Sequence, residues 1–392
     1  MFKRCATFAL VTMLVPMLGF AAQGKLIEDR ITSSSLEGNL LGDPATRRMM
    51  VYLPPSYDTS SSRQYPTVYL LHGFLGNYTF FAWSMNAFAQ SMGMDLGLDI
   101  RAIADSLIAA GATEEMIIVM PDGLSSYGGG WYERSPVIGN YRDYIARDLV
   151  AYIDGKYRTI PNRGSRGISG HSMGGYGALC LAMEYPEVFG AVAAMSPGFP
   201  NDFSVPPTPI DGFIAENPDT LGEPVILDPA KDTMELMPIA GVIFTTNFST
   251  NALYAMAAAF SPDPDDPPYY VDLPVRYPEK SIVQDVWERW IERDLVHLIA
   301  RKGTNLFGTP IFVDQGVGPT VIMPEMPNVD RVVVALREAG LDCTYEEVDG
   351  DHLTHLREQV TSALKFLSSH LVEYGAPAAS PSSWGRIKTK FK

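Results

Sequence analysis

The chain alternates between short apolar segments and longer helical patterns, and this alternation restricts the fold more than any other feature of the sequence. The segment YPTVYLLHG is almost wholly apolar from Val68 to Leu71, as is typical of a strand buried on both faces of a parallel sheet. The helical pattern IRAIADSLIAAG and the strand-like EMIIVMPDG follow it, and the same order recurs as far as HLREQVTSALKFLSSHL. The sequence therefore predicts an α/β fold with a mostly parallel central sheet and helices on both faces.

The alternation stops between about residues 198 and 280. This segment is rich in proline and acidic residues, and TNALYAMAAAF is its one strong helical stretch. We interpret it as an insertion over the carboxyl edge of the sheet, where lids and ligand-binding walls occur; the alternative is a surface excursion without a role. Its aspartates Asp263, Asp265 and Asp266 lack the glycine and terminal glutamate of a calcium loop, which favours a solvated turn. We expect no metal and no other cofactor.

The first residues have the layout of a secretory signal peptide. Lys3 and Arg4 precede an apolar run from Ala6 to about Phe20, and small residues follow. The run is shorter than the roughly 20 residues of a spanning helix, which favours cleavage at about residue 22 over membrane anchoring. We therefore expect a secreted or periplasmic protein with no integral membrane segment after cleavage. One domain is expected over 25–375, followed by a disordered basic tail over 376–392.

Charge and cysteine content exclude several classes of partner and site. The formal net charge is −15, and such an acidic surface repels phosphate backbones, which disfavours nucleic-acid binding. After the signal peptide only Cys180 and Cys343 remain, too far apart in the sequence for a zinc motif and too few for a disulfide framework. The fold must therefore be held by its hydrophobic core.

A candidate nucleophile lies in the segment GHSMG over 170–174, which matches the pattern G-x-S-x-G. The strand-like residues 166–169 precede it, and the helical ALCLAMEYP follows shortly after. Small flanking residues permit the strained turn from strand to helix that raises a serine above a sheet. A helix that starts directly after Ser172 also places its positive end beneath the serine, where it favours a developing oxyanion. The pattern predicts Ser172 as a nucleophile.

An acyl-transfer site also needs two main-chain N–H donors for the oxyanion. Met173 follows the nucleophile and supplies the first. The second is expected in the loop HGFLG, after the buried strand, where Phe74 is our first choice and Leu75 our second. His72 precedes the glycine at the strand end, and we interpret it as structural.

The histidine that acts as the base for Ser172 should follow a late strand, since in this fold the order of the catalytic residues along the chain is serine, acid, histidine. His352 ends the segment VDGDH, where a strand passes into a turn, and it is our first choice. His355 is three residues further and is the second. His297 and His370 fall within helical patterns, where surface or packing roles are favoured.

These segments resemble the putative-esterase branch of the α/β-hydrolases, which includes S-formylglutathione hydrolase, feruloyl and acetyl-xylan esterases and the mycolyltransferases. The matching stretches are VYLPPSYD, YPTVYLLHGFLGN, IIVMPDG, YRTIPNRGSRGISGHSMGGYGAL, PEVFGAVAAMSPG and ALREAGLDCTYEEVDGDH. The resemblance implies an α/β-hydrolase fold and an acyl-enzyme formed on Ser172. It further implies that Phe74 and Met173 amides form the oxyanion hole and that His352 is the base.

The third catalytic residue, the carboxylate that orients the histidine, departs from the family pattern. Relatives carry an aspartate a few residues beyond a strand like IFVDQG, but the loop here reads VGPTVIMPE. Glu325 is its first carboxylate and our first choice; Asp314 is the second. The acid is otherwise missing or distant, with Asp202 as one candidate, and a chain without an acid is a feeble esterase or a binding protein on a degenerate hydrolase fold.

We expect a serine carboxylesterase that acts on a small-molecule or carbohydrate-linked ester. Export disfavours the cytosolic glutathione-thioester role of some relatives. Acyl transfer to a sugar or alcohol is the alternative chemistry. The aromatic residues after the fourth strand, Tyr127, Trp131 and Tyr132, line the site in one interpretation and belong to the core in the other.

Overall fold

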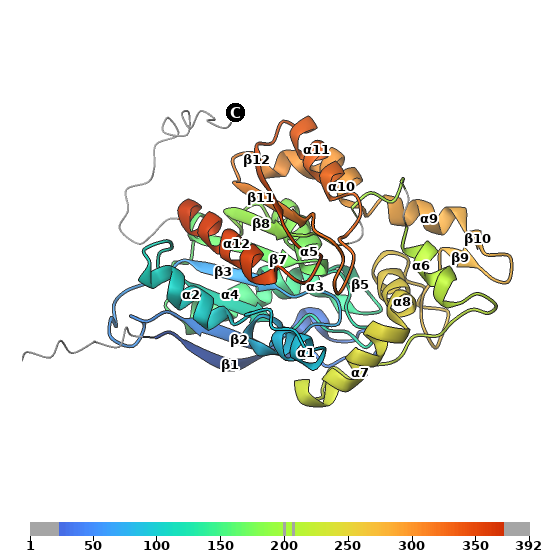
Figure 1. The fold of residues 1–392 in the computed structure, drawn as a ribbon, viewed down its shortest axis with the longest axis horizontal. Helices are drawn as coiled ribbons and strands as arrows, with labels where there is room; N and C mark the ends of the chain where they lie inside the picture. Colours follow the sequence, from blue (N-terminus) through green and yellow to red (C-terminus); the bar gives the residue numbers. More distant parts are fainter. Residues whose placement is uncertain (1–22, 199–200, 206–207, 372–392) are drawn as a thin grey trace, which may run out of the picture.

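A computed structural model describes residues 23–198, 201–205 and 208–371. The predicted signal peptide and basic tail lie outside these residues. Eight strands form the central sheet, in the spatial order β1-β2-β4-β3-β7-β8-β11-β12 (Figure 1). Their bounds are β1 Lys25–Thr32, β2 Thr46–Leu53, β3 Thr67–Leu71, β4 Ile117–Pro121, β7 Arg166–His171, β8 Ala191–Met195, β11 Ile311–Gly316 and β12 Cys343–Val348.

Strand direction decides where functional loops meet. β1 pairs antiparallel with β2, and β2 pairs antiparallel with β4. All neighbours from β4 to β12 pair in parallel. The carboxyl ends of these six strands therefore lie at one edge of the sheet, where parallel α/β folds place their ligands.

Helices cover both faces of the sheet (Figure 1). Their bounds are α1 Met85–Ser91, α2 Ile100–Ala109, α3 Tyr141–Asp143, α4 Val150–Lys156, α5 Met173–Glu184, α6 Pro209–Glu216, α7 Thr233–Thr246, α8 Phe248–Phe260, α9 Gln284–Ile291, α10 Leu295–Lys302, α11 Val329–Glu338 and α12 Leu356–His370. Two π-helical segments, Phe80–Ser84 and Tyr144–Leu149, lead into α1 and α4. Two short hairpins join β5 Arg134–Ser135 to β6 Gly139–Asn140 and β9 Val275–Arg276 to β10 Ser281–Ile282.

Successive residues of each strand serve opposite faces, because side chains alternate along a strand. In β3, Val68 and Leu70 belong to the hydrophobic cluster shared with α1, α2 and α12. Tyr69 and Leu71 belong to the cluster on the other face, which holds α4, α5, α8, α10 and α11. All five residues of β3 are buried, as expected for a central parallel strand. The structure confirms the predicted fold class.

In its described residues, the segment between 198 and 280 contains three helices, α6, α7 and α8, whereas the sequence pattern indicates only α8. The sequence of α7 shows no helical periodicity, because the helix is apolar on almost all sides. It also contains Pro238, and proline normally ends a helix. The helical segment that follows, VWERWIERDLVHLIARKG, contains the end of α9 and the whole of α10. Asp294 begins α10, because its side chain accepts a hydrogen bond from the amide of His297.

Within the described ranges, no helix combines the length and the apolar character that crossing a bilayer requires.

Candidate active site

Ser172 stands on a sharp turn between β7 and α5. Its backbone has φ 57° and ψ −120°, a conformation that costs free energy for any residue other than glycine. The two flanking glycines make the turn possible: a Cβ at Gly170 would lie 2.3 Å from the carbonyl oxygen of Gly174, and one at Gly174 would lie 2.1 Å from that of Leu71. Ser172 thus begins α5 at the carboxyl edge of the sheet.

His352 and Glu325 come together at the same edge. The Nδ1 of His352 lies 3.1 Å from Oε1 of Glu325, and the pairing makes Nδ1 the protonated nitrogen. The ring is almost fully buried, and its Nε2 has no hydrogen-bond partner among the described residues. Nε2 is therefore a free acceptor, and His352 lines the same pocket as Ser172.

Glu325 is held as a carboxylate by donors on both oxygens. Oε1 accepts from the amide of Met326 at 2.9 Å as well as from His352. Oε2 accepts from the amide of Gly316 at 2.7 Å and from the hydroxyl of Ser196 at 3.1 Å. Burial acts to raise the pKa of Glu325, but these hydrogen bonds outweigh it and hold the pKa below its usual value.

The other two candidates for the acid are bonded elsewhere. Asp314 lies inside β11, where its Oδ1 accepts from the amide of Ser196 at 2.9 Å and from Nε2 of Gln359 at 2.7 Å. Asp202 forms an ion pair with Arg331. Of the three carboxylates considered from the sequence, only Glu325 contacts His352.

Asp314 carries an electrostatic consequence of its own. Its side chain is fully buried, and burial, the largest effect, raises its pKa to about 8 against the hydrogen bonds from Ser196 and Gln359. An acid whose pKa rises on folding binds more protons in the folded than in the unfolded state, here between its usual pKa of 3.8 and about 8. Its contribution to stability is therefore present at low pH and is lost as the pH rises through about 8.

We expect the variant Asp314→Asn to lose less unfolding free energy than the wild type between about pH 5 and about pH 9, because the amide cannot ionise. Urea unfolding at both pH values measures the difference. Asp265→Asn, at an exposed turn, is the matched control and should follow the wild type. Equal pH slopes for Asp314→Asn and the wild type would contradict the raised pKa.

Asp351, which the sequence analysis did not single out, fastens the loop of His352. Its Oδ1 accepts from the amides of Leu353 and Thr354 at 3.0 and 2.9 Å. Its Oδ2 accepts from the amides of Val321 and Met323 at 2.7 and 3.1 Å. The Asp351 carboxylate therefore ties the loop that carries the histidine to the loop that carries the acid. The only signal in the sequence was its place directly before His352.

The oxyanion candidates differ in whether their amides are free. The amide of Leu75 donates to the carbonyl of Gly128 at 2.9 Å, so the second-choice donor is already used. In the described part of the chain, the amide of Phe74 makes no hydrogen bond, and that of Met173 lies in the first turn of α5. A Cβ at Gly198 would lie 3.0 Å from the Met173 nitrogen and 2.8 Å from Ser172 Oγ, so the glycine keeps this space open.

His72 anchors the loop 72–76, which carries Phe74 and is called the oxyanion loop below. Its Nδ1 donates to the carbonyl of Gly73 at 2.8 Å, and its Nε2 accepts from the amide of Gly123 at 2.8 Å. Burial lowers the pKa of His72 to about 4, so the ring is neutral near pH 7 and both nitrogens are used. These contacts agree with a structural role.

The remaining histidines are placed differently from His352. His171 donates through Nε2 to the carbonyl of His352 at 2.9 Å, and the two rings are 4.6 Å apart. His355 is buried next to Gly316 and does not line the pocket. His297 pairs with Asp294 at 2.8 Å. His355, the second choice for the base, thus lies behind the site rather than in it.

The three aromatic residues after β4 are buried and do not line the pocket. The Tyr132 hydroxyl donates to the carbonyl of His72 at 3.1 Å, and the Tyr127 hydroxyl donates to that of Tyr269 at 3.0 Å. Trp131 stacks on Phe74 at 5.6 Å. Their positions agree with the second interpretation, in which they belong to the core; Tyr132 and Trp131 also contact the loop that carries Phe74.

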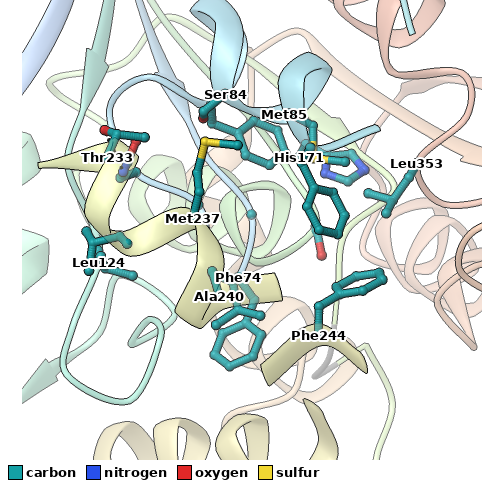
Figure 2. A pocket seen from close by; sticks show the side chains of 18 of the residues that line it. Phe74, Ser84, Met85, Leu124, His171, Thr233, Met237, Ala240, Phe244 and Leu353 are labelled. Atoms are coloured by element: carbon teal, nitrogen blue, oxygen red, sulfur yellow. Dashed lines mark hydrogen bonds between the residues drawn. The ribbon is translucent and has the colours of Figure 1, made fainter. Parts of the chain in front are cut away.

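Ser172 and His352 line one pocket. Most of its other lining side chains are apolar, among them Met85, Leu124 and Met237 (Figure 2). The pocket encloses about 880 Å³ of space, its open mouth included. One wall is the unexpected helix α7, which contributes Leu236, Met237 and Phe244. The segment interpreted as a lid or wall therefore does border the candidate site, through a helix that the sequence pattern did not reveal.

Comparison with known proteins gives one family match that spans most of the chain. Residues 44–355 match the family described as "Putative esterase". An esterase of Mycobacterium tuberculosis is 33% identical over 150 residues, which are 37% of this chain and 28% of that protein. The chain therefore matches well under half of the length of this relative.

Solved structures share the fold at low sequence identity. A ferulic acid esterase superposes with a TM-score of 0.55 and 20% identity over 89% of this chain and 99% of its own. An S-formylglutathione hydrolase from Agrobacterium tumefaciens superposes with a TM-score of 0.52 and 17% identity over 90% and 98%. These two likenesses establish a common fold.

Proposed function

Because this chain belongs to the putative esterase family and has the α/β-hydrolase fold, we propose that it is a serine carboxylesterase that forms an acyl-enzyme on Ser172. One observation carries the proposal. Glu325 binds the Nδ1 of His352 at 3.1 Å and leaves Nε2 unpartnered among the described residues, in the same pocket as Ser172. A neutral imidazole with a free Nε2 is what a serine nucleophile needs as its base.

Acylation begins when Ser172 Oγ attacks the carbonyl carbon of the ester and Nε2 of His352 takes its proton. The carbonyl oxygen becomes an oxyanion, which the amides of Phe74 and Met173 stabilise. The Glu325 carboxylate stabilises the imidazolium. His352 then gives the proton to the alcohol oxygen, the bond between that oxygen and the carbonyl carbon breaks, and the alcohol leaves.

Deacylation repeats these steps with water. His352 takes a proton from the water, and the resulting hydroxide attacks the acyl carbon. The same two amides hold the second oxyanion. The bond to Ser172 Oγ then breaks, the proton returns to Oγ, and the carboxylic acid is released.

We also propose that the protein acts outside the cytoplasm. This rests on the signal-peptide pattern of the first residues, and an exported esterase meets small-molecule or carbohydrate-linked esters rather than cytosolic thioesters.

Covalent labelling tests the proposed acyl-enzyme. A fluorophosphonate reacts with an activated serine, so intact-mass analysis should show one adduct and peptide mapping should place it on Ser172. The Ser172→Ala protein should stay unlabelled. An adduct on another residue, or none, would contradict the proposal. Adding an alcohol or sugar acceptor during ester turnover then measures the ratio of transferred ester to free acid, and mainly transferred ester would identify a transferase.

A further inference from the structure

The pocket that contains Ser172 is lined mainly by apolar side chains. No lysine, arginine, aspartate or glutamate is among the described residues that line it. Phenylalanine, methionine and leucine side chains make most of its surface, and Figure 2 shows Phe74, Met237 and Phe244 directed into it. Such walls favour an uncharged apolar group over a charged or hydroxylated one, because a polar group loses its hydration without gaining a partner.

An aromatic wall runs along one side of this pocket. The ring of Phe88 in α1 lies 5.2 Å from that of Phe244 in α7. Phe244 lies 5.8 Å from Phe248, and Phe248 lies 5.5 Å from Phe74 in the oxyanion loop. These edge-to-face contacts join α1, α7, the start of α8 and the loop after β3 into one apolar surface that ends beside the candidate oxyanion donor.

Two polar side chains that line the pocket, those of Asn77 and Thr233, are already paired with each other. Asn77 donates from Nδ2 to the hydroxyl of Thr233 at 3.0 Å. Its Oδ1 accepts from the amide and hydroxyl of Thr79 at 2.9 and 2.7 Å. These groups anchor the start of α7 to the loop after β3, and they have little capacity left to recognise a polar substrate.

The proposed mechanism decides which half of the ester faces this wall. His352 must protonate the leaving alcohol oxygen, so the alcohol half lies on the side of His352 and its neighbour Leu353. In Figure 2, Leu353 is drawn at one side of the pocket, whereas Thr233 and Leu124 are drawn at the other. The acyl half therefore extends away from Leu353, along α7.

Resting on the esterase function proposed above, we propose that this pocket binds an apolar, uncharged acyl chain of medium length, and that Met237 and Ala240 of α7 line the path of this chain. Thr233, Met237, Ala240 and Phe244 all line the pocket, so one face of α7 follows its length. At the usual rise per residue, that face measures about 16 Å, far more than an acetyl group needs.

A chain-length series tests the substrate class. With p-nitrophenyl esters from acetate to decanoate, kcat/KM should rise by up to about fourfold for each added methylene that becomes buried, and it should reach its maximum between hexanoate and decanoate. A parallel series of acetate esters with longer alcohols should show a weaker rise. If the alcohol series shows the stronger rise, the assignment of the pocket to the acyl half is overturned.

A substitution in α7 tests the role of the helix. Ala240→Trp should lower the octanoate-to-acetate ratio of kcat/KM at least tenfold, because the indole occupies the chain's path. Val242→Trp is the matched control: Val242 lies on the same helix, is 54% exposed and does not line the pocket, so rates and ratio should follow the wild type. Thermal unfolding of both variants shows whether the fold is retained, and Ala240→Leu provides a smaller obstruction should the larger one unfold the helix.

The possible results separate this inference from the function on which it rests. Acetate hydrolysis with no gain from longer acyl chains overturns the acyl pocket and leaves the esterase intact. An unchanged ratio in a folded Ala240→Trp protein shows that the acyl chain does not run along α7. If no ester is hydrolysed above the Ser172→Ala background, the esterase proposal fails and the acyl pocket fails with it.

Discussion

Replacing Ser172 by alanine should lower kcat for p-nitrophenyl butyrate by about 10⁴ to 10⁶, because the variant has no oxygen that attacks the carbonyl carbon. The oxyanion amides and the pocket remain, so a small rate above water persists. Stability should change little, since the Ser172 side chain makes no capping hydrogen bond to α5 and alanine meets the same backbone strain as serine. Steady-state kinetics and thermal unfolding measure the two effects.

Ser169→Ala is the matched control for this experiment. Ser169 lies in β7, the strand that leads to Ser172; it is fully buried and has no partner for its hydroxyl in the described part of the chain. Its loss should leave kcat within about threefold of the wild type, as is usual when no interaction is removed. Similar losses in both variants would point to disturbance of β7, and a Ser172→Ala protein of wild-type activity would exclude Ser172 as the nucleophile.

Those features of the protein that depend on short stretches of sequence could be predicted from the sequence. Alternating strands and helices predicted the α/β fold, and the quoted stretches predicted the family; the structure and the family match confirm both. The G-x-S-x-G motif indicated Ser172, the order along the chain indicated His352, and the family resemblance pointed to the loop of Glu325; the structure places all three at the carboxyl edge of the sheet. Their catalytic roles stay predictions until the variants are measured.

The remaining features depend on contacts between distant segments. The sequence around Leu75 does not show that its amide donates a hydrogen bond to Gly128. The sequence around Asp351 does not show that its side chain joins two loops. α7 borders the pocket, yet its pattern is not amphipathic and Pro238 interrupts it, because the helix is apolar both toward the pocket and toward the outside. Periodicity identifies helices with one buried face, so a helix of this kind is easily missed.

Replacing Glu325 by glutamine should lower kcat by about 10³ to 10⁴ with little change in KM. The four hydrogen bonds that the carboxylate accepts explain the size of the effect. With its amide nitrogen toward Gly316 and Ser196, the glutamine would face the Gly316 N–H with a second donor. With the amide nitrogen toward His352, it would donate to Nδ1 and move the ring proton to Nε2, where the histidine can no longer accept the serine proton.

Asp314→Asn distinguishes the two carboxylates considered for this role. Asparagine has the shape of aspartate, just as glutamine has the shape of glutamate, so the two substitutions are comparable. Asp314 accepts hydrogen bonds from Ser196 and Gln359 and makes none with His352. Its replacement should change kcat by less than about threefold at neutral pH, as is usual when no contact to the reacting groups is lost. Kinetics of both variants across the pH range, with circular dichroism to verify folding, measure the contrast. If Asp314→Asn reduces kcat more than Glu325→Gln does, the acid has been assigned to the wrong residue, and the hydrogen bond between Glu325 and His352 serves only to hold the loop.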